Sequence, residues 1–256
     1  MRLANKAGLR NTLKKLGAIG HEGAESHDRA TAAQEALDFV AMLAGIKPVL
    51  LLGRGFDDAR WLEGALRIAI DLRLHVVEGP YWDAEPSHAG LPEWYSEHAR
   101  AAVQGFRAHY VCKARAVAHE VAELCRSGTP SIEDEARLLG YPRCCVEAHH
   151  GRERDYQLAW LSVLEREAGG DEAGMRRLLA DGAPLPPATG GERARLEAAM
   201  AVQIAPFTSV NMCAPCAGSS DGPARSMSRR YGELARSLDP GLARSLAAAS
   251  VIAGAA

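Results

Sequence analysis

Two pairs of cysteines constrain the fold of this chain more than any other feature of its sequence. Cys144 and Cys145 are adjacent, and Cys213 and Cys216 follow about seventy residues later with two residues between them. Thiols that share one site must converge in space, so the residues between the pairs have to leave the site and return to it. The sequence therefore predicts a fold in which two distant segments meet at a four-cysteine site.

The first pair is predicted to lie in the first turn of a helix. Gly140 can adopt the left-handed conformation that ends one helix, and Pro142 can begin the next. Backbone N–H groups and the helix dipole at such an N-terminus stabilise a thiolate, as does the guanidinium of Arg143. We therefore expect the pKa of Cys144 or Cys145 to be lowered.

The second pair has the spacing of a metal knuckle. Cys213-Ala214-Pro215-Cys216 is a C-x-x-C turn in a segment rich in Gly, Ser and Pro, and such a turn lets two sulfurs converge on one ion. The other two cysteines, Cys112 and Cys125, fall within apolar patterns of helical period. We expect them to be buried packing residues rather than ligands.

Four thiols can serve three kinds of chemistry. Adjacent residues on a helix project about 100° apart, so Cys144 and Cys145 reach a single ion awkwardly, whereas the separate irons of a cluster such as [4Fe–4S] suit them better. The sequence favours an iron–sulfur protein that acts on a small molecule, with Cys144, Cys145, Cys213 and Cys216 as ligands. The alternatives are a zinc-binding interaction module and a thiol/disulfide redox protein that uses Cys213 and Cys216.

Two further side chains share a helix face with the first cysteine pair. His149 follows Cys145 by four residues and Glu147 follows Cys144 by three, and both spacings place the members on one face. His149 and Glu147 are therefore candidate catalytic residues, His149 as a ligand or a proton carrier. The simpler alternative is that His149 and His150 form a solvent-facing pair.

Upstream of the cysteines, the pattern changes from helical to strand-like. Residues 48–52 form a short apolar run that ends at Gly53, and residues 74–77 form a second one after a helical stretch. This order predicts a parallel βαβ unit over residues 48–77. The turn after the first run has two of the three glycines of a dinucleotide motif, but Asp57 and Asp58 would repel a pyrophosphate.

The predicted fold class is α/β or α+β, with helix predominating. Residues 1–45 are expected to form an N-terminal helical segment, and residues 46–256 a single compact domain. In that domain the small parallel βαβ element comes first, and a helical region over residues 97–250 carries the four-cysteine site.

Charge and hydropathy exclude several partners. The chain has 30 Lys and Arg against 32 Asp and Glu, a net charge of -2, which argues against nucleic-acid binding through a basic field. The longest apolar run near the C-terminus, residues 246–256, is too short to cross a membrane. Without an apolar signal sequence the six cysteines are expected in a reducing compartment, the cytoplasm. A small molecule is the expected partner.

The segment Leu138–Ala148, LLGYPRCCVEA, resembles the LGYP-x-CC-V-x-A/F signature of an uncharacterised prokaryotic family. In that family a strand–helix–strand segment precedes the signature, as at residues 48–77. A later Pro-Cys/Cys segment followed by serines accompanies it, similar to residues 213–220. This chain departs from the pattern in its tight C-x-x-C. The resemblance implies a shared thiol-rich site and supplies no reaction.

Overall fold

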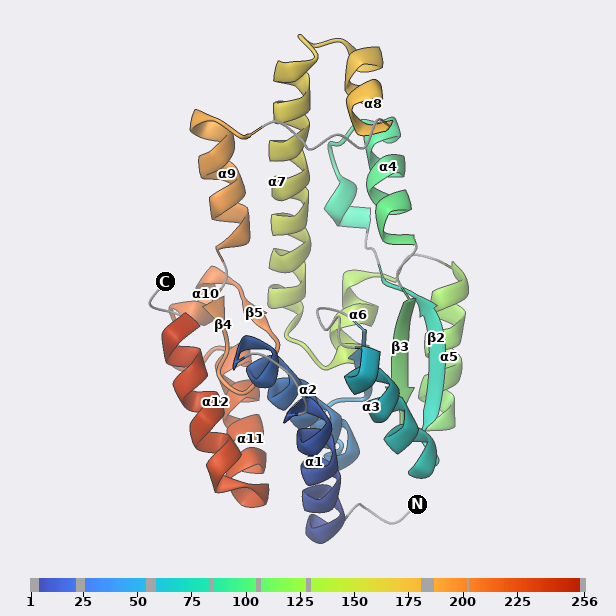
Figure 1. The fold of residues 1–256 in the computed structure, drawn as a ribbon, viewed down its shortest axis with the longest axis vertical. Helices are drawn as coiled ribbons and strands as arrows, with labels where there is room; N and C mark the ends of the chain where they lie inside the picture. Colours follow the sequence, from blue (N-terminus) through green and yellow to red (C-terminus); the bar gives the residue numbers. More distant parts are fainter. Residues whose placement is uncertain are drawn as a thin grey trace.

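The protein is described by a computed structural model in which helices predominate and a small sheet is set among them (Figure 1). The structure describes residues 5–21, 26–53, 59–82, 85–104, 107–127, 130–180, 187–201 and 203–253. Its elements, in chain order, are α1 (Lys6–His21), α2 (Ser26–Ala44), β1 (Val49–Leu52), α3 (Ala59–Asp71), β2 (His75–Pro80), η1 (Glu85–His88), α4 (Glu93–Gln104), β3 (Arg107–Cys112), α5 (Arg115–Ser127), α6 (Ile132–Leu139), α7 (Arg143–Glu167), α8 (Glu172–Ala180), α9 (Gly190–Met200), β4 (Gln203–Ile204), β5 (Asn211–Met212), α10 (Ala214–Ala217), α11 (Pro223–Leu238) and α12 (Pro240–Ala253).

The main sheet has the strand order β1-β3-β2, and β3 pairs antiparallel with both neighbours. The two predicted strands therefore exist, but the predicted parallel βαβ unit at residues 48–77 is wrong, because β3 lies between them. Sequence patterns missed β3 because only Lys113 and Ala114 separate it from α5. The apolar residues of strand and helix merge there into one run that has helical spacing.

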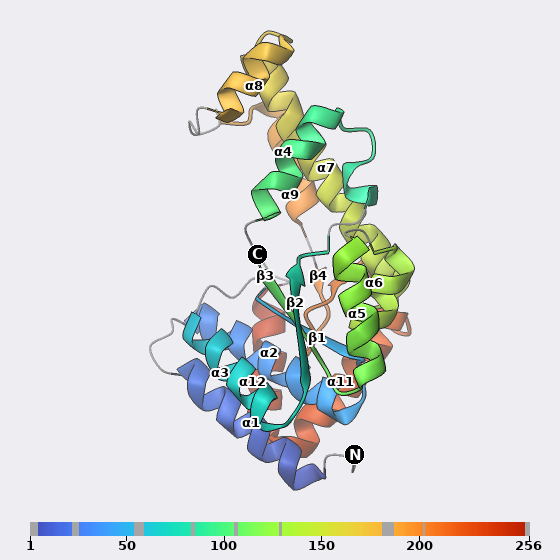
Figure 2. The same cartoon turned by 90° about the vertical axis from the view of Figure 1, so that its right-hand side faces the viewer.

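Helices cover both faces of this sheet. Figure 2 shows α3 on one side of the sheet and α5 on the other. In Figure 1, α1, α2, α11 and α12 lie on the side of the sheet away from α5. The largest buried cluster joins side chains from these helices and from β1, including Leu16, Phe39, Leu50, Trp61 and Tyr231. Both α1 and α2, from the segment predicted to be helical before residue 45, thus contribute to the same core as the C-terminal helices.

The long helix α7 connects this body to a helical arm. Its 25 residues span about 38 Å, and its second half extends away from the sheet, where α4, α8 and α9 surround it (Figure 1). Separate small cores hold the arm together, one around Tyr95 and Leu164 and another around Val163 and Leu196. Cys144 and Cys145 are at the opposite end of this helix, inside the body.

A glycine turn sets the direction in which α7 leaves α6. Gly140 caps α6 with a φ of 70°, and the N–H of Tyr141 donates to the carbonyl of Ala136 at 2.9 Å. Pro142 then precedes the first residue of α7. The predicted helix stop at Gly140 and helix start at Pro142 are confirmed, and so is the position of the cysteine pair in the first turn.

Replacing Gly140 tests how strongly this turn holds the site. A Cβ at Gly140 would lie 3.0 Å from the Cβ of Lys47, and its positive φ is unfavourable for any L side chain. We expect Gly140→Ala to lower the free energy of unfolding by about 1–2 kcal/mol, measured by urea denaturation.

Gly151→Ala is the matched control, since Gly151 lies inside α7 with nothing within 4 Å of its added Cβ. That change should leave the stability unchanged or raise it by up to about 1 kcal/mol. Equal effects at the two glycines would contradict the role given to the turn.

Candidate metal centre

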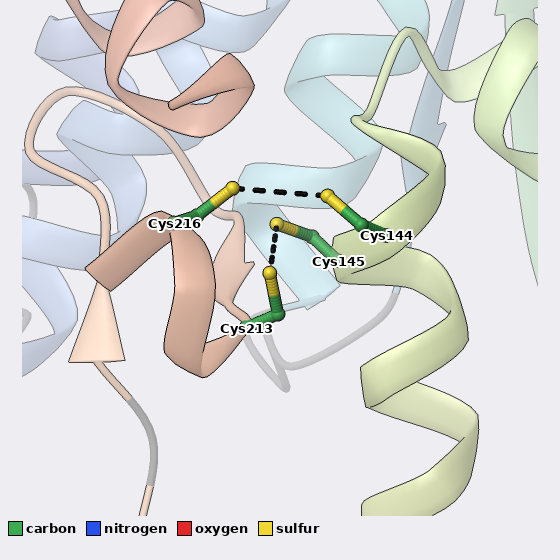
Figure 3. Close-up of side chains that lie close together, drawn as sticks. All are labelled: Cys144, Cys145, Cys213 and Cys216. Carbon is green, nitrogen blue, oxygen red and sulfur yellow. Dashed lines mark hydrogen bonds between the residues drawn. The ribbon is translucent and has the colours of Figure 1, made fainter. Parts of the chain in front are cut away.

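The four predicted cysteines converge on one point, as Figure 3 shows. The Sγ atoms of Cys144 and Cys216 are 3.7 Å apart, and those of Cys145 and Cys213 are 3.8 Å apart. All four sulfurs lie within 4.8 Å of one another, and all are free thiols. The predicted meeting of the two cysteine pairs is confirmed, and the arrangement is compatible with a metal-binding site.

Two elements present these thiols from opposite sides. The first turn of α7 carries Cys144 and Cys145. Across from it, the hairpin of β4 and β5 leads directly into Cys213, the N-cap of the one-turn helix α10, which contains Cys216. The carbonyl of Cys213 accepts a hydrogen bond from the N–H of Ala217 at 2.9 Å, which fixes the C-x-x-C turn.

The site is closed on most sides. Cys145, Cys213 and Cys216 are 2%, 4% and 2% exposed, whereas Cys144 is open to solvent. A metal held here would therefore be shielded by protein, with Cys144 as the sulfur that faces water.

The pKa values of the cysteine thiols differ from the sequence-based expectation. Partial desolvation and hydrogen bonds with the thiols of Cys216 and Cys213 raise the pKa of Cys144 to about 11, although this residue is open to solvent. Burial raises the pKa of Cys145 further. Burial also opposes ionisation of Cys213, but the N–H of Cys216 and the neighbouring thiols donate hydrogen bonds to its sulfur, so its pKa is lowered overall. The prediction of a lowered pKa at the start of α7 is wrong, because the stabilising hydrogen bonds converge on the C-x-x-C turn instead.

The two histidines after the cysteines have different surroundings. His150 is buried, with Nδ1 2.8 Å from Oγ of Ser87 and Nε2 2.7 Å from Oε2 of Glu135. It is therefore not a solvent-facing residue, and it links η1, α6 and α7 through one buried network. His149 is partly buried, and its Nε2 is 4.0 Å from Oε1 of Glu153.

The candidate catalytic residues lie outside the thiol group. Among the described residues, the close group of potential ligands contains the four cysteines and no histidine or carboxylate. His149 lines a neighbouring cavity instead. Glu147 is exposed on α7 and does not line that cavity.

A cavity of about 250 Å³ lies beside the cysteines, and Cys145 forms part of its wall. Three acidic side chains also line it: Glu35 and Asp38 from α2, and Glu135 from α6. Sequence reasoning missed all three. The one signal in the sequence was weak: Asp38 interrupts the otherwise apolar run of residues 36–44, where acids are uncommon.

The acids of α2 are held by a buried lysine. Lys47 Nζ is 3.9 Å from Oδ2 of Asp38 and 4.9 Å from the ring centre of Tyr141. Burial, assisted by the charge of Asp38, raises the pKa of Glu35 to about 8, against the opposing effect of Lys47. The wall of the cavity thus holds a carboxyl group that resists ionisation.

Cys112 and Cys125 are separate from the four-cysteine group. Cys112 is fully buried on β3, so its predicted helical setting is wrong. Cys125 lies on α5 against Gly79 of β2. Burial, with a contribution from Cys125, raises the pKa of Cys112 to about 12, as expected for a packing residue.

Comparisons with family models, with curated proteins and with solved structures give no match. The resemblance of residues 138–148 to the LGYP-x-CC family therefore stays a prediction that rests on the motif. No helix among the described ranges is long and apolar enough to span a membrane. The glycine-containing turn at residues 54–58 is outside the described residues.

The raised pKa of Glu35 predicts how stability depends on pH. In the unfolded chain this carboxyl ionises near its ordinary pKa of 4.5, whereas in the fold it stays protonated up to about 8. The stability that its protonated form contributes is complete below the lower value and is lost as pH rises through the higher one. We expect Glu35→Gln to flatten this decline, measured as the free energy of unfolding of both proteins at pH 5, 6.5 and 8.

Glu133→Gln is the control, because Glu133 is exposed on α6 and ion-paired with Arg143 at 3.3 Å. It should keep the wild-type slope. An unchanged slope in Glu35→Gln would show that Glu35 ionises normally in the folded protein.

Proposed function

We propose that the four cysteines bind a single zinc ion that fixes the start of α7 to the β5–α10 segment. The observation that carries this proposal is the spacing of the sulfurs. Four thiolates in a tetrahedron around zinc, with Zn–S bonds of about 2.3 Å, lie about 3.8 Å apart. The two closest pairs here are at 3.7 and 3.8 Å.

The same spacing supports one ion over a cluster. In an iron–sulfur cluster the thiolates bind different irons, and the sulfide ions between these irons keep the thiolates apart. Sulfurs that all lie within 4.8 Å leave less room for such a cluster than for one metal ion. The iron–sulfur protein favoured by the cysteine pattern becomes the second candidate.

Cys144 and Cys145 are adjacent on a helix and point in different directions, which argued against a single ion. The positions of the two opposite thiols remove this objection. Each of these thiols faces a different member of the opposite pair, Cys144 facing Cys216 and Cys145 facing Cys213 (Figure 3). The diverging directions of two successive helix residues are thereby matched by the two ends of the C-x-x-C turn. This interlocked pairing supports ligation by all four cysteines.

Four thiolates complete the coordination of zinc, which is the usual arrangement of a structural site. The proposed role is therefore mechanical: the ion joins segments about seventy residues apart and holds one wall of the adjacent cavity through Cys145. Binding of the metal then contributes to the folding free energy.

Metal analysis of the purified protein tests the proposal. After anaerobic purification we expect one zinc per chain, no acid-labile sulfide and no visible absorption, measured by plasma mass spectrometry, sulfide assay and spectroscopy. A brown protein with iron and sulfide in similar amounts would overturn the zinc assignment in favour of a cluster.

Cysteine variants test the ligand set. Cys213→Ser removes the thiol with the lowered pKa, and we expect it to lose most of the zinc and to unfold at a lower temperature. Cys112→Ala is the matched control, since that cysteine is equally buried. It should keep its zinc and cost only about 1–2 kcal/mol of stability through a small cavity. Full zinc content in Cys213→Ser would contradict the proposed site.

A further inference from the structure

We propose that the cavity beside the cysteines binds a small organic cation, a protonated amine with a short apolar body. The proposal concerns the cavity of about 250 Å³ between α2, α6 and the start of α7. The proposal is based on the side chains that line this cavity, and it does not depend on which metal the cysteines bind.

Two buried acceptors in the cavity wall lack partners. Oε2 of Glu35 and Oδ1 of Asp38 are buried and have no hydrogen-bond partner among the described residues. The hydroxyl of Tyr231, whose pKa Asp38 helps to raise, is likewise buried without a partner. Asp38 is only 4% exposed. A buried carboxylate oxygen without a donor is costly, and a ligand N–H group would remove that cost.

Two of the three acids in the wall, Asp38 and Glu135, are held in place by hydrogen bonds. Ser209 donates a hydrogen bond to Oδ2 of Asp38 at 2.9 Å. Oε2 of the third acid, Glu135, is fixed by His150 at 2.7 Å. A binding site whose acceptors are already oriented loses little entropy when a ligand arrives, so this arrangement favours recognition of a donor group.

The balance of charge in the wall selects a cation. Glu35, Asp38 and Glu135 line the cavity. Lys47, which is not a lining residue, pairs with Asp38, and His150 pairs with Glu135. Glu35 forms no such pair among the described residues and stays protonated up to a pH of about 8, so a bound ammonium group would let it release its proton and act as the counter-ion. An ammonium group supplies both the compensating charge and several N–H donors. A carboxylate or phosphate ligand would instead be repelled by the wall.

The rest of the wall selects an organic body over a bare ion. The lining includes the aliphatic residues Leu50, Leu51, Leu139, Val146 and Val210. A divalent metal ion requires several oxygen ligands at once, and among the described residues the carboxyl groups of the wall do not converge closely enough to form such a group. The volume is below the range of about 300–1,000 Å³ typical of drug-sized ligands, so the occupant is a small metabolite.

A matched series of probes tests this inference on the full chain. Butylamine, butanol and butyrate have the same hydrocarbon body and carry a cation, a neutral hydroxyl and an anion. We expect saturable calorimetric binding and a raised melting temperature with butylamine at millimolar concentration, and neither with butanol or butyrate. Equal binding of the three, no binding of butylamine, or displacement of butylamine by magnesium ions would overturn the proposal.

Charge-neutralising variants locate the site. Glu35→Gln and Asp38→Asn keep the shape of each side chain and remove the carboxylate that would face the ammonium group in the complex, and each should weaken butylamine binding at least tenfold. Glu133→Gln, on the exposed face of α6, is the control and should change the affinity less than twofold.

Zinc content and circular dichroism are measured on each variant to separate this test from that of the metal centre. If Asp38→Asn does not fold, Glu35→Gln and the wild-type probe series decide the outcome. A folded, zinc-loaded Glu35→Gln protein that binds butylamine as the wild type does would show that the cavity acids do not recognise the amine.

Discussion

The contact between the first turn of α7 and the C-x-x-C turn is the constraint on which the rest of the structure depends. It brings Cys144 and Cys145 to the segment that follows the β4–β5 hairpin, although an entire helical arm intervenes in the chain. Because α11 and α12 follow this hairpin and pack against α1 and α2, the same contact also sets where the C-terminal helices meet the N-terminal ones. Four sulfurs thus determine the position of much larger elements.

The cavity follows from the same arrangement. One wall comes from α2, another from α6, and the start of α7 closes it beside Cys145. The buried network of Ser87, His150 and Glu135 supports this wall from the side of η1. The four-cysteine site and the cavity are therefore adjacent, although their chemistry differs: thiols on one side and carboxyl groups on the other.

The four cysteines of the site and the helix boundary beside them could be predicted from the sequence, whereas the pairing of the strands could not. Gly140 and Pro142 fix their own backbone conformations, so the helix boundary beside Cys144 follows from residue type alone. In contrast, the place of β3 between β1 and β2 depends on contacts between residues far apart in the chain. Nothing within residues 107–112 specifies those partners.

The sequence pattern also gave little indication that Glu35 and Asp38 are buried. Glu35 and Asp38 occupy a helix whose polar residues read as an ordinary solvent-facing stripe, and only the packing of Tyr141 and Lys47 against that stripe makes it interior. The pKa of Cys144 likewise depends on neighbouring elements that lie far away in the sequence. A helix start favours a thiolate, but the burial imposed by neighbouring elements prevails at this position.

Because α7 is long, its direction at the cysteine site determines where the helical arm lies. One end of this helix carries two of the sulfurs, its second half carries the contacts to α8 and α9, and its far end is about 38 Å away. A tilt of about 10° at the base would move the far tip by roughly 6 Å, a simple consequence of helix length. A rigid α7 would thereby convert a small reorientation at the four sulfur atoms into a displacement as large as a side chain at the far end of the arm.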